Sequence, residues 1–180
     1  MPCRPTRGFT LVELMITVAV MAILVAIGFP GFQSVLASNR VATGTNELIA
    51  SLALARGEAV RNTVSSGVCP SATGTDCGND WSEGWLVWQD VDGNGNLDDA
   101  EPVLRYSQGR LGLELSSRGV TKFIFDSRGR ATGRDVSDTV AAGAQVIAVR
   151  ATGCSAEQSL ARALTVMPTG QVRVVRQTCS

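Results

Sequence analysis

Histidine is absent from the 180-residue chain, and lysine occurs once, as Lys122. The lack of imidazole excludes histidine-based triads, histidine general acid–base catalysis and imidazole metal sites. None of the five cysteines lies in a Cys-x-x-Cys pair, which argues against zinc and thioredoxin-like redox sites. Only scattered carboxylates could activate a serine or cysteine nucleophile. We therefore expect a protein that is not an enzyme and that requires no cofactor.

Charge is scarce in one N-terminal stretch. Residues 9–29 are 21 residues in which Glu13 is the only charge. As a helix they would measure about 31 Å, the thickness of the hydrocarbon core of a bilayer. Arg4 and Arg7 precede the run, so the positive-inside rule keeps the N-terminus in the cytoplasm. No good small-residue cleavage site follows it, which favours a retained membrane anchor.

Glu13 is the unusual residue of this span, because a charge at mid-bilayer costs roughly 2.5–3.5 kcal/mol. The stretch "GFTLVELM" after a short basic leader resembles the class III signal of type IV pilins and type II secretion pseudopilins. That resemblance implies that a prepilin peptidase cleaves between Gly8 and Phe9 and methylates the new N-terminus at Phe9. It also implies that Glu13 neutralises a cationic N-terminus, its own or a neighbour's, during subunit assembly.

The helical pattern continues beyond the span, after Pro30 and Gly31, which should bend or loosen it. An apolar stripe with 3–4 spacing predicts an amphipathic helix that lies on a sheet and ends near Asn62. The stripe consists of Val41, Thr45, Leu48, Leu52, Ala55 and Ala59. We therefore divide the chain into a removed cytoplasmic leader (1–8), a transmembrane half-helix (9–31), a periplasmic half-helix (32–62) and a β-rich head (63–180).

The head has the patterning of strands and turns, with no second long helix, which favours antiparallel pairing. The expected fold is α+β: a pilin fold, with a long N-terminal helix packed on an antiparallel sheet or sandwich. The stretch "SRGRATGRD" reads as a tight turn or hairpin loop. The predicted strands are 84–89, 102–107, 111–115, 122–126, 145–151, 163–168 and 171–177.

A tryptophan-rich strand in the head leads into an acidic segment. Alternation places Trp85 and Trp88 on opposite faces of the strand, one in the core and one partly covered. The following residues match the EF-hand loop pattern D-x-[DN]-x-[DN]-G-x₅-E in full, which makes calcium a candidate ligand. The alternative is an ion-free turn, because Asp and Asn favour turns by bonding their own backbone. The candidate ligands are Asp90, Asp92, Asn94, Asn96, Asp98 and Glu101.

The tryptophan strand and its Asp/Asn/Gly turn also resemble the head of the GspH/FimT (FimU) branch of pilin-like proteins. There the turn connects the two strands of a β-hairpin.

Four cysteines beyond the span suggest two disulfides in an oxidising compartment, and three pairings are open. We favour Cys69–Cys77, which closes a short loop, and Cys154–Cys179, which ties down the C-terminus.

Opposite charges gather in different parts of the head. Residues 63–104 contain eight acids and no base, whereas residues 105–180 contain eleven bases and five acids. A basic face is typical of nucleic-acid binding, but it equally suits docking on an acidic neighbour, which we favour. Some members of the FimT branch serve DNA uptake, and the resemblance associates this with a Gly-Arg-x-Arg element near the C-terminus. In this chain Gln171 stands where the first arginine of that element would be. The candidate DNA contacts are Arg128, Arg130, Arg134, Arg173 and Arg176.

The chain is thus expected to be a single-pass inner-membrane minor pilin or pseudopilin with a periplasmic head. It would assemble near the tip of a type IV pilus or a type II secretion pseudopilus. The expected partners are the prepilin peptidase, other minor pilins or pseudopilins and the major subunit. The alternative is a DNA-binding minor pilin that serves natural transformation.

Overall fold

The computed structural model describes residues 8–179, which divide into two compact units, with the boundary in the chain between residues 36 and 37. The predicted leader therefore lies outside the described residues, except for Gly8. One helix, α1 (Leu11–Asn62), contributes to both units and ends where the sequence predicted. It runs without interruption through Pro30 and Gly31. Its 18-residue apolar window has a mean hydropathy of 2.6 and is not buried, so it is long and apolar enough to cross a membrane.

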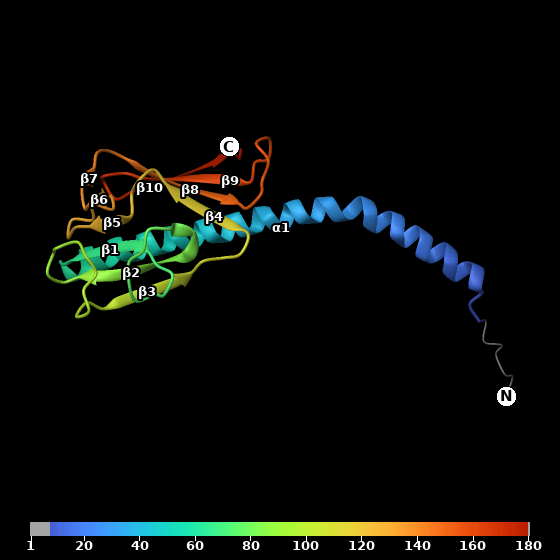
Figure 1. The fold of residues 1–180 in the computed structure, drawn as a ribbon, viewed down its shortest axis with the longest axis horizontal. Helices are drawn as coiled ribbons and strands as arrows, with labels where there is room; N and C mark the ends of the chain where they lie inside the picture. Colours follow the sequence, from blue (N-terminus) through green and yellow to red (C-terminus); the bar gives the residue numbers. More distant parts are fainter. Residues whose placement is uncertain (1–7, 180) are drawn as a thin grey trace, which may run out of the picture. The chain divides into compact units, whose positions relative to one another are not determined.

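The second unit contains two antiparallel sheets (Figure 1). The six-stranded sheet has the order β3-β2-β1-β5-β6-β7, and the four-stranded sheet has the order β10-β9-β8-β4. A short 3₁₀ helix, Trp81–Glu83, leads into β2. The strands are β1 (Ser65–Pro70), β2 (Gly84–Asp90), β3 (Val103–Gln108), β4 (Leu113–Ser117), β5 (Lys122–Phe125), β6 (Ala131–Arg134), β7 (Val140–Ala141), β8 (Gln145–Ala151), β9 (Ala161–Val166) and β10 (Val172–Gln177).

The main core forms where α1 packs against both sheets. Trp85 and Phe123 of the six-stranded sheet and Ile147 of the four-stranded sheet share one buried cluster with Leu48 and Leu52 of α1. Every residue of the stripe predicted from 3–4 spacing is buried, from Val41 to Ala59. The stripe is rich in small residues, so the helix lies close to the strands (Figure 1).

The predicted antiparallel arrangement and all seven predicted strands are present, but three further strands were missed. The residues 65–70 follow the helix without apolar alternation, yet they form β1, which pairs with β2 on one side and β5 on the other. The stretch 127–135 is only partly a turn. Its second half forms β6, which pairs with β5 and carries the short β7 on its other edge.

The prediction that one tryptophan of β2 is only partly covered was wrong. Trp85 and Trp88 point to opposite faces of β2 as expected, but both are fully buried. Trp85 lies in the main core. Trp88 belongs to a second, outer cluster with Cys69, Leu86 and Ile124. Leu97, from the acidic loop (residues 90–101) between β2 and β3, packs against this cluster. The acidic loop is therefore attached to the folded head through Leu97, which packs on the outer face of the sheet.

Candidate functional site

The predicted processing site lies just ahead of the first helical turn. A Cβ atom added at Gly8 would meet nothing within 4 Å, and Phe9 is 77% exposed. Thr10 caps the helix, because its Oγ1 accepts a hydrogen bond from the backbone N–H of Glu13 at 3.2 Å. The Gly8–Phe9 bond is thus in exposed, non-helical chain.

Glu13 occupies the first turn of α1, where the positive end of the helix dipole favours a carboxylate. The Thr-x-x-Glu spacing of Thr10 and Glu13 is the capping-box signature, which the sequence interpretation did not use. Among residues 8–179, no arginine or lysine lies at ion-pair distance from the Glu13 carboxylate. Its charge is therefore open to a partner outside the described chain.

The acidic loop connects β2 to β3 within a β-hairpin, so its flanks are strands and not the helices of an EF-hand. The backbone N–H of Gln89 donates to the carbonyl of Pro102 at 3.1 Å and closes the base of the loop. Gly93 and Gly95 both have φ of +76°, a conformation that glycine adopts without strain. The loop can therefore turn sharply twice within three residues.

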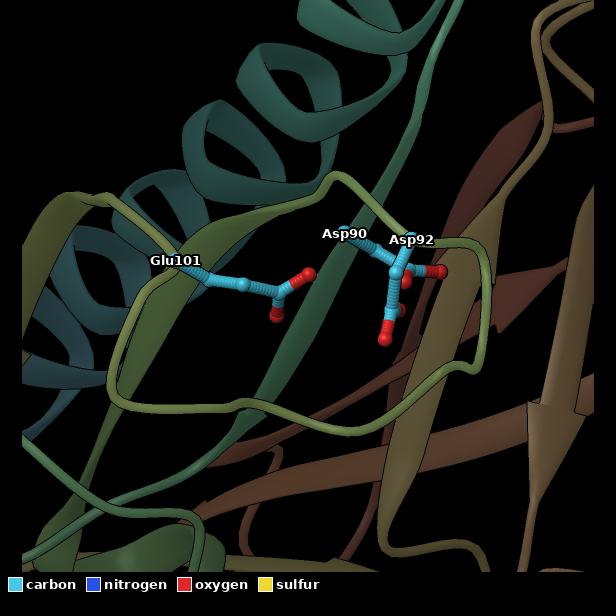
Figure 2. A group of neighbouring side chains, drawn as sticks. All are labelled: Asp90, Asp92 and Glu101. Carbon is cyan, nitrogen blue, oxygen red and sulfur yellow. The ribbon is translucent and has the colours of Figure 1, made fainter.

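Three of the predicted ligands converge inside this loop. Asp90, Asp92 and Glu101 each bring one carboxylate oxygen within 4.8 Å of the others. Figure 2 shows the side chains of Asp92 and Glu101 directed toward the same space, with Asp90 beside them. Asn94 lies next to this group, and its Nδ2 donates to Asp92 Oδ2 at 2.7 Å and to Asp98 Oδ2 at 2.8 Å. Asn96 instead accepts from Lys122 through its side-chain oxygen at 2.6 Å.

Asp90 is the buried member of the group, with 1% of its surface exposed. Its Oδ2 accepts the backbone N–H of Gly95 at 3.2 Å, whereas its Oδ1 has no hydrogen-bond partner among the described residues. Burial raises the pKa of the Asp90 carboxyl; the N–H groups of Gly95 and Gly93 oppose this, and the charges of Glu101 and Asp92 add to it. An ionised carboxylate here has only these neutral N–H groups and no cationic partner among the described residues, whereas buried charges are normally paired.

The nearest basic side chains do not supply that compensation. Lys122 pairs with Asp138 at 2.6 Å, and Arg134 pairs with the other oxygen of the same carboxylate at 2.6 Å. Within residues 8–179, no lysine or arginine forms an ion pair with Asp90, Asp92 or Glu101. Lys122 and Asp138 were not predicted as neighbours of the loop. They lie on β5 and in the turn before β7, and the order of the strands in the sheet, which the sequence did not predict, brings them near it.

The structure thus combines a helix long and apolar enough to cross a membrane, an exposed Gly8–Phe9 bond ahead of it, and a β-rich head. The family model described as type II transport protein GspH matches residues 44–172, which comprise the last part of α1 and most of the head. The chain belongs to this family. A second model, the prokaryotic N-terminal methylation motif, matches residues 3–29 of this GspH-family chain.

Solved structures agree with this assignment at the level of the fold. The type IV minor pilin FimU of Pseudomonas aeruginosa PAO1 matches in one crystal form with a TM-score of 0.56 at 20% identity, over 79% of this chain and 96% of that chain. A second FimU crystal form matches with a TM-score of 0.52 at 20% identity, over 77% of this chain and 98% of that chain. The minor pseudopilin EpsH of the Vibrio cholerae type 2 secretion system matches with a TM-score of 0.50 at 13% identity, over 76% of this chain and 96% of that chain.

Together, the family and the pilin-like fold make the chain a minor pilin or pseudopilin, a structural subunit of a type IV pilus or a type II secretion pseudopilus.

Both predicted disulfides are formed in the GspH-family head. Cys69 and Cys77 have Cα atoms 5.6 Å apart, and Cys154 and Cys179 have Cα atoms 6.1 Å apart, both within the ordinary range. The first bond joins the end of β1 to the loop before β2. The second holds the chain that follows β10 against the loop between β8 and β9, where Cys179 N–H also donates to Gln158 O at 2.9 Å.

The structure distributes the five candidate DNA-contacting arginines over several elements. Arg130 pairs with Asp126 at 2.7 Å, and Arg134 pairs with Asp138. Arg128, Arg173 and Arg176 are exposed. Arg173 and Arg176 lie three residues apart on β10, so their side chains project from opposite faces of the sheet.

Proposed function

We propose that the chain assembles near the tip of a type IV pilus or type II secretion pseudopilus. Residues 9–31 would anchor it in the inner membrane, with the head in the periplasm. A prepilin peptidase would cleave between Gly8 and Phe9 and methylate Phe9. The supporting observation is that the methylation-motif match and the GspH match occur on one chain, with Gly8–Phe9 exposed just before the capped helix.

Glu13 would act in docking during assembly. Its carboxylate has no cationic partner in the described part of the chain, and it lies in a segment apolar enough to span a membrane. In a medium of low dielectric, an opposite charge within a few ångströms attracts it far more strongly than in water. The amine of a processed Phe9, from the same or a neighbouring subunit, would supply that charge.

The first experiment is intact-mass and N-terminal peptide analysis of the protein purified from its host's membranes. A mature chain that starts at Phe9 and carries one added methyl group would support the proposal. A chain that still starts at Met1 would show that the signal is not used, and the proposed assembly would fall with it.

A second experiment tests Glu13 itself. Glu13→Gln removes the charge but keeps the shape, so membrane insertion should persist while incorporation into sheared pili or a pseudopilus is lost. Glu157→Gln is the matched control, because it removes one exposed negative charge from the head. Wild-type incorporation of Glu13→Gln would contradict the docking role.

DNA uptake is the alternative function, and the exposure of Arg128, Arg173 and Arg176 is the observation in its favour. Phosphate contacts by arginine make binding strongly salt-dependent. Retention of DNA at low salt by the purified protein, lost on changing Arg173 and Arg176 together, would support this function. We favour subunit docking, because the acidic 63–104 segment offers a complementary surface on a neighbouring copy or related subunit.

A further inference from the structure

We propose that the loop from Asp90 to Glu101 is a calcium site, with the carboxylates of Asp90, Asp92 and Glu101 as its central ligands. This inference concerns the head and does not depend on how the chain is processed or assembled.

The first argument is the buried, unpartnered oxygen of Asp90. A carboxylate this deeply buried is normally fully hydrogen-bonded or paired, because a buried charge without partners is costly. Gly95 satisfies Oδ2, but Oδ1 has no partner among residues 8–179. The side chain lies beside the space that Asp92 and Glu101 enter (Figure 2). A cation bound there would provide the partner that the described chain lacks.

The second argument is the spacing of the oxygens. Calcium binds oxygen at 2.3–2.6 Å, so two oxygens on opposite sides of one ion lie about 4.6–5.2 Å apart. One oxygen each from Asp90, Asp92 and Glu101 already fall within 4.8 Å of one another. The three side chains could therefore contact a single ion with little backbone movement.

The third argument is electrostatic. Three carboxylates this close repel one another, and the two nearby bases are paired with Asp138 instead. The N–H groups that do reach the loop carboxylates are neutral: Val91 N–H donates to Glu101 Oε1 at 2.7 Å, and Asp98 N–H to Oε2 at 3.3 Å. They hold Glu101 in place without cancelling its charge. A divalent cation would cancel it.

The remaining predicted ligands, Asn94, Asn96 and Asp98, belong to the same loop. Asn94 now directs its Nδ2 between the carboxylates of Asp92 and Asp98, so its amide would turn to present Oδ1 to an ion. Asn96 would contribute its backbone carbonyl, because its side chain is engaged by Lys122. Asp98 would act directly or through water. An all-oxygen set of this size suits calcium better than magnesium, which requires near-ideal octahedral geometry and retains its waters.

The test is calorimetric titration of the full-length, chelator-treated protein in detergent with CaCl₂, and in parallel with MgCl₂. We expect one calcium per chain, with a Kd between about 10⁻⁶ and 10⁻³ M and weaker binding of magnesium. At tenfold excess over Kd, calcium should raise the melting temperature by about 3–6 °C. Absence of binding at about 10 mM calcium, well above the range of extracellular modules, would overturn the proposal.

Variants separate a built site from a diffuse negative surface. Asp90→Asn should weaken calcium binding at least about tenfold, because it removes the buried ligand charge. Glu101→Asp keeps the charge but withdraws the carboxylate, and it should weaken binding to a similar extent even if Asp90→Asn does not fold. Glu157→Gln, an exposed charge outside the loop, should bind like wild type. Equal losses in Glu157→Gln and Glu101→Asp, or wild-type affinity in Glu101→Asp, would refute the site.

Discussion

Trp85 of β2 donates a hydrogen bond from its indole Nε1 to the hydroxyl of Ser51 on α1, with 2.9 Å between the two atoms. Both side chains are buried in the main core. The bond satisfies the one polar atom of a large aromatic ring and links the helix to β2, the strand next to the edge of the six-stranded sheet.

Replacement of Ser51 tests this link. Ser51→Ala leaves the Trp85 N–H buried without an acceptor, so the free energy of unfolding should fall by about 1–3 kcal/mol. Denaturant unfolding of the full chain in detergent measures the loss. Ser38→Ala, at an exposed position of the same helix, is the control and should change stability by less than about 0.5 kcal/mol. Equal stability of the two variants would show that the bond contributes nothing.

Gly67 on β1 tests the outer cluster. A Cβ at Gly67 would lie 2.1 Å from the ring of Trp88, which is fixed by its buried surroundings. Gly67→Ala should therefore cost about 1–3 kcal/mol or more of unfolding free energy. Gly57→Ala is the matched change: the position is exposed in α1 with nothing near the new methyl group, so it should gain up to about 1 kcal/mol. A Gly67→Ala variant as stable as wild type would contradict the packing of Trp88 against β1.

Asp126 should make the head less stable in acid. Burial alone would raise its pKa, but hydrogen bonds from the N–H and guanidinium of Arg130 and the N–H of Arg128 outweigh it, so the pKa is lowered. A carboxyl with a lowered folded-state pKa stabilises the fold fully above its unfolded pKa of about 3.9. That contribution is lost as the pH falls through the folded-state value.

The corresponding measurement compares melting temperatures of wild type and Asp126→Asn. At pH 7 the variant should melt about 1–3 °C lower, a small effect because the pair with Arg130 is partly exposed. Near pH 3 the difference in melting temperature between the two proteins should become smaller. Glu157→Gln, which also removes one negative charge, should show no gap at pH 7. A constant difference for Asp126→Asn at both pH values would mean that its effect does not come from ionisation.

The disulfide Cys154–Cys179 should contribute measurably to stability. It closes a segment with a sequence separation of 25, for which chain-entropy arguments give about 3–4 kcal/mol. The double variant Cys154→Ala/Cys179→Ala should lose an amount of this order in denaturant unfolding. A loss below about 1 kcal/mol would indicate that the hydrogen bond from Cys179 N–H to Gln158 already holds the terminus in place.

The sequence predicted the elements whose patterns are local. The spacing from Val41 to Ala59 identified the buried stripe of α1, and seven strands followed from alternation and turn residues. The missed β1 has no such pattern, because it is buried on both faces and needs small residues. Gly67 in particular leaves room for Trp88 from the neighbouring strand. A requirement set by a residue 21 positions away leaves no local signal.

In the acidic loop, too, the sequence predicted the features that depend on local order and missed those that depend on distant residues. The twelve-residue pattern named every carboxylate that the structure brings together, since their order within one turn determines their approach. The pattern did not show that Asp90 is buried with one oxygen unpartnered, or that Lys122 and Arg134 pair with Asp138. Those features depend on how β5 and β6 place their side chains beside the loop, which follows from strand order.

The packing of Leu97 against the cluster around Trp88 has an optical consequence. Trp81 and Trp85 face the main core, so Trp88 is the indole that shares a cluster with a residue of the acidic loop. A rearrangement of the loop that moves Leu97 would change the surroundings of this ring, and tryptophan emission responds to such changes. The head therefore contains its own fluorescent reporter of the state of the loop, which needs no attached dye.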